Sequence, residues 1–156
     1  MSNAEFFYND INAPFPNKPI HVGACAIIIC EKEMLLEKRA DSNTWALVGG
    51  GINMDESLEE CILREISEET GLNILKEDLD FIKVYSDPSR IAKYPDGNVL
   101  RIITAAYLVR LKNRTELIRS DESLELRFFN LPEVLELKIA ATHRHIIKEF
   151  LDVSCL

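Results

Sequence analysis

The order of apolar and polar positions divides the chain into segments typical of strands and of helices. Runs that are rich in apolar and β-branched residues and end at polar or turn-forming residues are typical of strands. The run from Val22 to Cys30 has the composition of a central strand that is buried on both faces. By the same criterion we predict strands at residues 22–30, 34–39, 45–48, 81–85, 99–109 and 125–129.

Helices are predicted where capping signals enclose an amphipathic stretch. Ser57 begins one such stretch, and Glu60 three residues later completes the capping-box pattern S-x-x-E. Gly71 ends it, at a position where a left-handed residue is favoured. We predict a second amphipathic helix over residues 140–152 and a short helical turn that begins at Pro132.

Other segments are rich in residues that interrupt regular structure. Residues 1–20 contain several prolines and are predicted to form an extended arm rather than a regular element. Residues 87–98 are predicted to form a long, turn-rich loop. The triple glycine at 49–51 is expected to turn sharply, because glycine tolerates positive φ. The rest of the chain, residues 21–156, is the size of one domain, and we predict an α/β fold with helices packed on a mixed sheet.

Composition and charge exclude some classes of function. The chain of 156 residues carries 18 Lys and Arg against 26 Asp and Glu, a formal net charge of −8. Proteins that bind a nucleic-acid backbone are normally basic, so we expect no polynucleotide partner. The longest apolar run is about half the length that a membrane-spanning helix needs, and no secretory signal is visible. We therefore expect no membrane association and a cytoplasmic location.

The cysteines point to the same compartment. No two of them have the CxxC spacing of a zinc or redox motif. We interpret all four as reduced thiols that act as small core residues: Cys25, Cys30, Cys61 and Cys155.

Carboxylates lie on the wrong side of the predicted helix 57–71 for a solvated face. At about 100° per residue, Leu58, Ile62 and Ile66 define its buried side. Three acidic residues fall within or beside that apolar sector: Glu65, Glu68 and Glu69. The alternative is a surface helix whose acids face water, but the helical wheel does not favour it.

Clustered carboxylates of this kind need compensation. Glu65 and Glu69 are four residues apart and repel each other, and partial burial increases the cost. Arg64 is a single arginine among many acids and cannot neutralise them all. Hard oxygen ligands in a cluster suit Mg²⁺, with Mn²⁺ as a possible substitute.

The same segment carries a recognisable motif. The pattern G-x5-E-x7-R-E-U-x-E-E-x-G-U is matched at every fixed position from Gly50 to Leu72, so the segment resembles the Nudix box of the Nudix hydrolases. The similarity extends to Trp45–Gly50, which resembles W-x-L-P-G-G with Val48 in place of proline. Residues 34–39 resemble the strand before the box, and residues 121–129 the later acidic segment that ends in W-F. Roughly residues 22–137 are covered.

The resemblance implies a Nudix-type α/β/α sandwich with a mixed sheet, in which the box forms loop–helix–loop. It implies hydrolysis of a pyrophosphate bond in a nucleoside diphosphate linked to a moiety X, either of the ADP-ribose or nucleotide-sugar type or a (d)NTP. It further implies that divalent ions are bound by three carboxylates and a backbone oxygen: Glu65, Glu68, Glu69 and Gly50. Arg64 would orient Glu56 or Glu65.

The general base differs among members of such a family. Glu65 is one candidate, and the others precede Phe128 in the later segment: Glu122 and Glu125. A carboxylate bound to a cation is a poor proton acceptor, because the ion lowers its pKa. We therefore favour Glu122, which lies further from the strand than Glu125 and on the more mobile part of the segment.

Substrate contacts are less specific in the sequence. Arginines offer bidentate contacts to phosphate, and of Arg39, Arg90 and Arg101 the first is best placed because it ends the strand that leads to the box. Each of the three is nevertheless more typical of a surface charge than of a phosphate contact. Four aromatic side chains are candidates to stack on a base, although such residues are also typical of the core: Trp45, Tyr85, Tyr94 and Phe129.

Two further segments contain residue types that often have a functional role. The loop Tyr94–Asn98 is long enough to be a lid over a substrate. His143 and His145 lie two residues apart on a predicted helix and so point in different directions, which excludes a shared metal and favours a packed or solvated pair.

A rival hypothesis is a non-catalytic Nudix-fold module that binds a nucleotide or a protein. Such a module has no need to keep like charges crowded together, and here all the box glutamates are present. We therefore favour a Mg²⁺-dependent pyrophosphohydrolase that acts on a small nucleoside diphosphate derivative. The sequence is also compatible with a homodimer.

Overall fold

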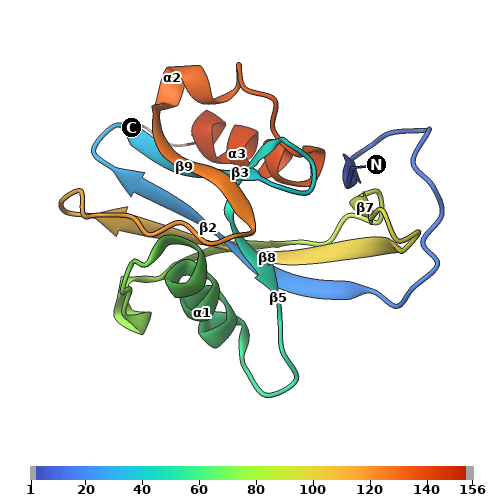
Figure 1. The fold of residues 1–156 in the computed structure, drawn as a ribbon, viewed down its shortest axis with the longest axis horizontal. Helices are drawn as coiled ribbons and strands as arrows, with labels where there is room; N and C mark the ends of the chain where they lie inside the picture. The colour runs from blue at the N-terminus through green and yellow to red at the C-terminus, as the bar shows by residue number, and fades with distance from the viewer. Residues whose placement is uncertain (1–2, 154–156) are drawn as a thin grey trace.

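Helices cover both faces of a curled, mixed β-sheet in this protein (Figure 1). The structure is a computed structural model that describes residues 3–153. The strands are β1 (Glu5–Phe7), β2 (His21–Cys30), β3 (Glu33–Arg39), β4 (Trp45–Ala46), β5 (Val48–Gly51), β6 (Asp80–Tyr85), β7 (Ile91–Lys93), β8 (Val99–Leu111) and β9 (Ser123–Asn130). The helices are α1 (Leu58–Thr70), a 3-10 turn η1 (Lys76–Asp78), α2 (Leu131–Val134) and α3 (Ala141–Val153).

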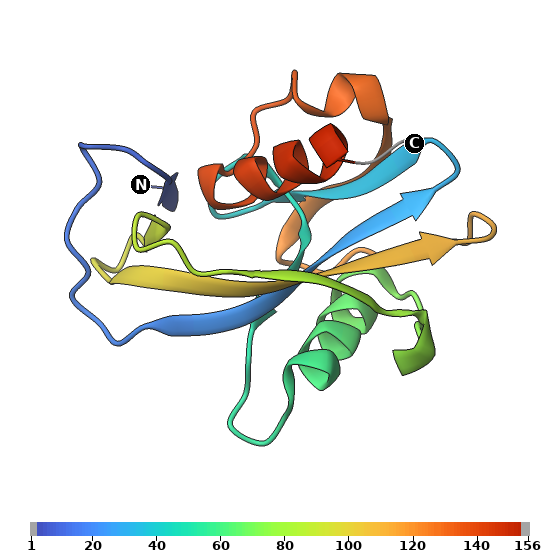
Figure 2. The ribbon, with the colours of Figure 1, turned by 180° about the vertical axis from the view of Figure 1, so that it is seen from behind.

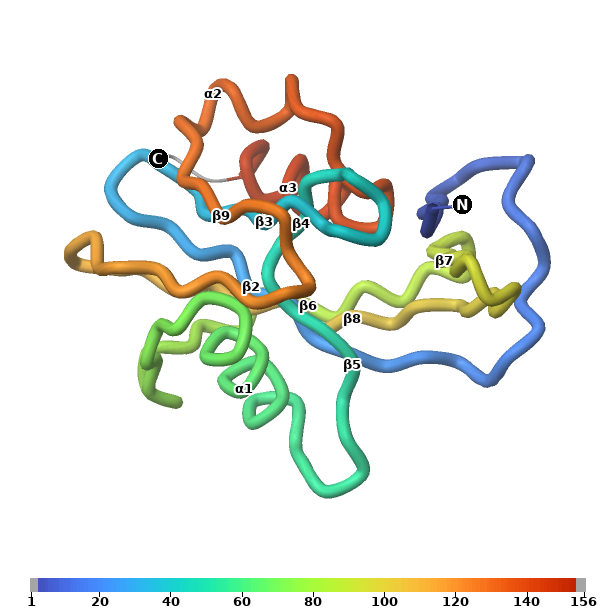
Figure 3. Tube along the Cα trace, in the orientation of Figure 1, coloured from blue at the N-terminus to red at the C-terminus, as the bar shows by residue number. Residues whose placement is uncertain are grey.

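The centre of the sheet is a parallel pair of long strands. β2 and β8 run side by side from His21 opposite Ile102 to Cys30 opposite Leu111. The other strand pairs among residues 3–153 are antiparallel: β1 with β7, β2 with β3 and β5, β3 with β4 and β9, and β8 with β6 and β7. Figure 3 allows this path to be followed along the chain.

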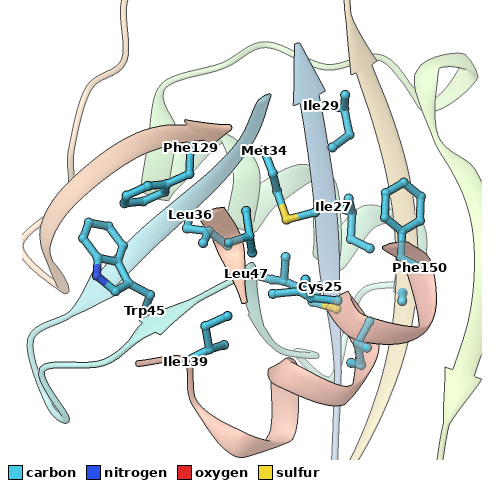
Figure 4. Close-up of a cluster of buried hydrophobic side chains, with 14 of the residues drawn as sticks. Cys25, Ile27, Ile29, Met34, Leu36, Trp45, Leu47, Phe129, Ile139 and Phe150 are labelled. Atoms are coloured by element: carbon cyan, nitrogen blue, oxygen red, sulfur yellow. The ribbon is translucent and has the colours of Figure 1, made fainter. Parts of the chain in front are cut away.

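Alternation along β2 divides the core into two layers, because successive side chains on a strand point to opposite faces. Cys25, Ile27 and Ile29 face the layer under α2 and α3, which Figure 4 shows in detail. Ala24, Ala26 and Ile28 belong to the other layer, which α1 covers with Ile62 and Ile66. Figure 2 shows α1 and α3 on opposite sides of the sheet from behind. The predicted α/β/α arrangement is therefore confirmed.

The predicted strands and helices are all present, with ends that differ by one or two residues, except that residues 45–48 are divided between β4 and β5. Two segments predicted to be irregular contain short strands. β1 lies within the arm of residues 1–20, and β7 lies within the loop 87–98. These two strands pair with each other, Glu5 opposite Lys93 and Phe7 opposite Ile91. Three-residue strands made by residues far apart in sequence leave no periodic pattern, so the sequence analysis missed them.

The expectation for the triple glycine was wrong. Gly49, Gly50 and Gly51 continue β5, and among the glycines in residues 3–153 only Gly71 and Gly97 have positive φ. A Cβ at Gly50 would collide with the carboxylate of Glu65, and a Cβ at Gly49 would collide with the backbone of β2. These glycines allow close approach rather than a turn.

Helix α1 forms as its capping residues predict. Ser57 accepts from the backbone N–H of Glu60, Glu60 accepts from the backbone N–H of Ser57, and Gly71 closes the helix with φ 74°. Ile62 and Ile66 are fully buried. Leu58 is only half-buried, which corrects the expectation, because it is the first helical residue and its side chain lies at the edge of the core layer.

The described cysteines agree with a structural role. Cys25, Cys30 and Cys61 are free and buried, and Cys155 lies outside the described residues. Within residues 3–153, no helix has the length and apolar character needed to cross a membrane.

Candidate active site

A pocket of about 420 Å³ opens where β3, β5, α1 and the loop before β9 meet. Its walls combine five carboxylates with the glycine-rich strand. The lining residues are His21, Glu37, Arg39, Ala40, Asp41, Gly49, Gly50, Gly51, Glu65, Glu69, Tyr94 and Glu122. Residues that are far apart in sequence are thus brought to one place by the sheet.

Two box glutamates reach this pocket from the buried side of α1. Glu65 is 9% exposed and Glu69 is 4% exposed, as the helical wheel predicts. The backbone N–H of Gly49 donates to Glu69 Oε2 at 3.1 Å. Burial raises the pKa of both carboxyls, and the negative charge of Glu37 raises that of Glu69 further. The arrangement is costly for two anions and favours a cation in the pocket.

Arg64 compensates the outer part of the acidic cluster. Its guanidinium donates to Glu56 at 2.9 and 2.7 Å, to Glu65 at 2.8 Å and to Glu68 at 3.2 Å. It also donates to the carbonyl of Gly51 at 3.0 Å. Hydrogen bonding from Arg64 lowers the pKa of Glu56 to about 2. The structure thus places Arg64 against both of the carboxylates that it was expected to orient.

Glu68 lies apart from the pocket. Its side chain is 58% exposed and faces Arg64 rather than the pocket wall. In residues 3–153, no three His, Cys, Asp or Glu side chains converge closely enough to hold a metal ion in their present conformations. The donor set is nevertheless one of hard oxygens, which fits Mg²⁺ or Mn²⁺.

The two later glutamates are separated by the structure. Glu122 lines the pocket from the loop before β9, and its carbonyl accepts from the backbone N–H of Ala40 at 3.1 Å. Glu125 lies on β9, opposite Lys38, and forms an ion pair with Arg127 outside the pocket. Only the first of the two is therefore positioned near the box carboxylates.

Glu37 is a pocket residue that was not among those predicted from the sequence. This residue of β3 is 3% exposed and lines the pocket, and burial raises its pKa. A signal was available in the strand pattern, because Leu35 and Glu37 share a face and Leu35 is fully buried under α1. A buried charge at an inward strand position beside a pocket is a candidate for a functional residue.

Arg39 and Tyr94 are the predicted substrate-contact residues that reach the pocket. Arg39 donates to Asp41 at 2.8 and 2.6 Å, and its guanidinium lies 4.9 Å from the centre of the Phe6 ring. Both residues also line a smaller cavity of about 70 Å³ beside the pocket, together with Phe6, His143 and other residues. The edge of the Phe6 ring meets Tyr94 at 6.4 Å between ring centres.

The other aromatic candidates are not at the site. Trp45 and Phe129 are each 8% exposed and meet edge to face at 4.8 Å in the core layer under α3 (Figure 4). Tyr85 belongs to the same layer. None of the three lines the pocket or the smaller cavity. The structure therefore does not support stacking of a base on Trp45 or Phe129, because apolar burial has placed these rings in the core.

Arg90 and Arg101 are also elsewhere. Arg90 is fully buried and donates to the carbonyls of Tyr85, Ile102 and Thr142 and to the Thr104 hydroxyl, so it fastens β7 and β8 to α3. Arg101 donates to the carbonyl of Ser86 at 3.0 Å. Neither guanidinium lines the acidic pocket.

The two histidines have separate partners. His143 Nδ1 accepts from the backbone N–H of Leu47 at 3.0 Å, and His145 Nε2 accepts from Arg90 Nε at 3.0 Å. The ring of His145 stacks on Tyr8 with 3.8 Å between centres. This agrees with the interpretation of a packed pair.

The Tyr94–Asn98 loop closes through a hydrogen bond from Tyr94 N–H to the Asn98 carbonyl, and only Tyr94 of this loop reaches the pocket.

A curled mixed sheet that carries an acid-lined pocket on a loop–helix–loop segment defines the class of the molecule. The model of the NUDIX domain matches residues 19–150, and the chain belongs to the Nudix hydrolase family. The resemblance noted in the sequence is thereby confirmed.

Individual relatives agree with this assignment. The chain is 33% identical over 133 residues to an ADP-ribose pyrophosphatase of Methanocaldococcus jannaschii, a match that covers 83% of this chain and 72% of the relative. A MutT/nudix family protein from Enterococcus faecalis superposes with a TM-score of 0.68 at 25% identity, covering 90% of this chain and 65% of that chain. The NUDIX domain of Shewanella oneidensis NrtR, solved with ADP ribose, superposes with a TM-score of 0.70 at 21% identity and 86% and 88% coverage. Other curated relatives are matched over 35% to 55% of their own lengths.

Proposed function

We propose that this protein hydrolyses the pyrophosphate bond of a small nucleoside diphosphate derivative of the ADP-ribose or nucleotide-sugar type, with Mg²⁺ or Mn²⁺ as cofactor. The observation that carries the proposal is the pocket in which two buried box glutamates meet Glu122 and Arg39. The 33% identity to an ADP-ribose pyrophosphatase supports the class of substrate. A (d)NTP is the second candidate within the same chemistry.

The cation would be held by the carboxylates of α1 and the adjoining backbone. We assign this role to Glu65, Glu68 and Glu69, with the carbonyl of Gly50 as a further oxygen ligand. When bound, such ions neutralise phosphate charge and lower the pKa of a coordinated water. Arg64 would hold Glu56, and through it the loop before α1, in place whether or not its bonds to Glu65 and Glu68 are kept.

Glu122 is proposed as the general base. It lies on a loop at the pocket mouth and forms none of the ion pairs found in residues 3–153. Its carboxylate can take a proton from the attacking water while the water oxygen bonds to phosphorus and the other phosphate leaves. Glu65 is less suited to this role, because Arg64 and its own burial already restrict its side chain.

Substrate binding is assigned to Arg39 and Tyr94, which line both the pocket and the smaller cavity, and to Phe6, which lines the cavity. Arg39 has a guanidinium within the pocket wall that can meet a phosphate oxygen while Asp41 holds it. Tyr94 and Phe6 line the adjoining cavity, which has mainly apolar walls. We place the organic part of the substrate there, next to the phosphates.

A panel of substrates tests the proposal. ADP-ribose, several nucleotide sugars and the common and oxidised dNTPs are incubated with the full chain in Mg²⁺, in Mn²⁺ and in EDTA, and products are identified by mass spectrometry. We expect AMP and ribose 5-phosphate from ADP-ribose, no turnover in EDTA, and loss of turnover in Glu69→Gln but not in Glu125→Gln. Saturable binding of ADP-ribose with no turnover of any compound would instead favour a non-catalytic binding module.

A further inference from the structure

Glu37 is a buried acid whose position needs an explanation. It stands on β3 opposite Ala46 of β4 and Leu126 of β9. Its side chain points to the same face as Leu35, which packs in the apolar layer under α1. The strand pattern therefore calls for an apolar residue, yet the position holds a carboxylate that is 3% exposed.

Protein partners compensate this carboxylate only in part. Ser123 donates its hydroxyl to Glu37 Oε2 at 2.8 Å. Among residues 3–153, no ion pair involves Glu37, and Oε1 accepts no hydrogen bond. Because Glu37 lines the acidic pocket, this second oxygen is available to whatever occupies it.

Neither neighbouring arginine donates a hydrogen bond to Glu37. Arg39 forms its two short hydrogen bonds with Asp41, and Arg64 is engaged by Glu56, Glu65 and Glu68. A carboxylate so deeply buried is costly unless it is paired. Arg39 acts on Glu37 through its charge but makes no direct contact, so a cation that touches this carboxylate must come from solution.

From these observations we infer that Glu37 is a ligand of the divalent cation in the pocket, contributed from outside the box helix. The inference rests on the proposed function, because it places Glu37 at the same cation site. Ser123 would fix Oε2, leaving Oε1 to bind the ion directly or through a water molecule. Glu37 and Glu69 would then form the inner end of the site, and Glu65 the end nearer Arg64.

Metal binding by the full chain, without substrate, tests this role. Mn²⁺ is titrated into metal-free protein and free Mn²⁺ is followed by electron paramagnetic resonance. Glu37→Gln keeps an acceptor for Ser123 but removes the charge, and we expect Mn²⁺ affinity to fall at least about tenfold. The melting temperature of the metal-free variant should be equal to that of the wild type or higher, because an unpaired buried charge has been removed.

Two variants separate a ligand from a merely structural residue. Ser123→Ala removes the hydrogen bond that orients Glu37 but keeps the charge, so Mn²⁺ affinity should fall less than in Glu37→Gln. Glu125→Gln, on β9 but outside the pocket, should bind Mn²⁺ as the wild type does. If Glu37→Gln does not fold, Glu37→Leu restores the apolar pattern of the strand and should fold but bind Mn²⁺ weakly.

The outcomes distinguish this inference from the proposed function. Wild-type affinity in Glu37→Gln, an equal loss in Ser123→Ala, or no saturable Mn²⁺ binding by the wild type would each overturn it. If Mn²⁺ binding depends on Glu37 while no compound in the substrate panel is hydrolysed, the inference stands and only the proposed function fails.

Discussion

Replacing Glu69 by glutamine should stabilise the metal-free protein. Glu69 is 4% exposed, and burial together with the charges of Glu37 and Glu65 raises its pKa to about 9. In the unfolded chain the same carboxyl titrates near 4.5. Glutamine has nearly the same shape and still offers an oxygen to the N–H of Gly49. The substitution therefore removes a costly charge and keeps the hydrogen bond.

The size of the effect follows from proton linkage. A raised carboxyl pKa costs nothing below the unfolded value, and its cost grows as the pH rises toward the folded value. Each pKa unit corresponds to about 1.4 kcal/mol, so at pH 7 the upper bound is about 3.5 kcal/mol. Because Glu37 shares the same repulsion, we expect a gain of about 1–3 kcal/mol. For a chain of this size that is roughly 3–10 °C in melting temperature.

Thermal unfolding in EDTA at several pH values measures this difference. The gain of Glu69→Gln over the wild type should be largest near pH 9 and should vanish near pH 4.5. Mg²⁺ should raise the melting temperature of the wild type more than that of the variant. Glu59→Gln, on the same helix but outside the pocket, should shift stability by only a few tenths of a kcal/mol. A metal-free Glu69→Gln protein that is less stable than the wild type at pH 8 would refute the reasoning.

Other substitutions test the remaining roles. Glu122→Gln should lower kcat strongly and leave Mn²⁺ affinity near the wild-type value, whereas Glu65→Gln should reduce both; a silent Glu122→Gln would exclude it as the base. Gly50→Ala should lower the free energy of unfolding by about 1–3 kcal/mol and weaken Mn²⁺ binding, because the added Cβ collides with Glu65. Wild-type Mn²⁺ affinity in this variant would contradict the assignment. Burial, and to a lesser extent the charge of Arg90, lowers the pKa of His143 to about 3. The neutral, buried imidazole therefore contributes fully to the stability of the fold above pH 6.5, and this contribution is lost as the pH falls toward 3. His143→Asn keeps an acceptor for the backbone N–H of Leu47. Between pH 7 and pH 5, its free energy of unfolding in urea should fall by about 2 kcal/mol less than that of the wild type.

The box helix could be predicted because its determinants are local. Ser57, Glu60 and Gly71 set its ends, and the spacing of Ile62 and Ile66 sets its buried face. Once that face is known, the inward positions of two glutamates follow from helix geometry alone. The long strands β2 and β8 could be predicted equally well, because both are rich in apolar and β-branched residues, as buried strands are.

What was missed depends on contacts between distant segments. Strands β1 and β7 are stabilised by each other, and neither has a pattern of its own. Trp45 and Phe129 were candidates for base stacking because they are aromatic, but their side chains point into the core. Glu37 was overlooked because a single acid in a strand has no spacing to recognise until Leu35 shows which face it shares.

The acids of the site form two groups with different partners, which explains how the site folds without a bound ion. Arg64 neutralises the outer carboxylates, Glu56, Glu65 and Glu68, through hydrogen bonds of 2.7 to 3.2 Å. The inner pair, Glu37 and Glu69, has only hydroxyl and amide donors. At the proposed cation site, Glu65 and Glu68 would exchange Arg64 for the ion while Glu56 stays with Arg64, so the net gain of these outer acids would be small. The proposed site would give the inner acids their first direct contact with a positive charge, and we expect most of the affinity for the cation to come from them.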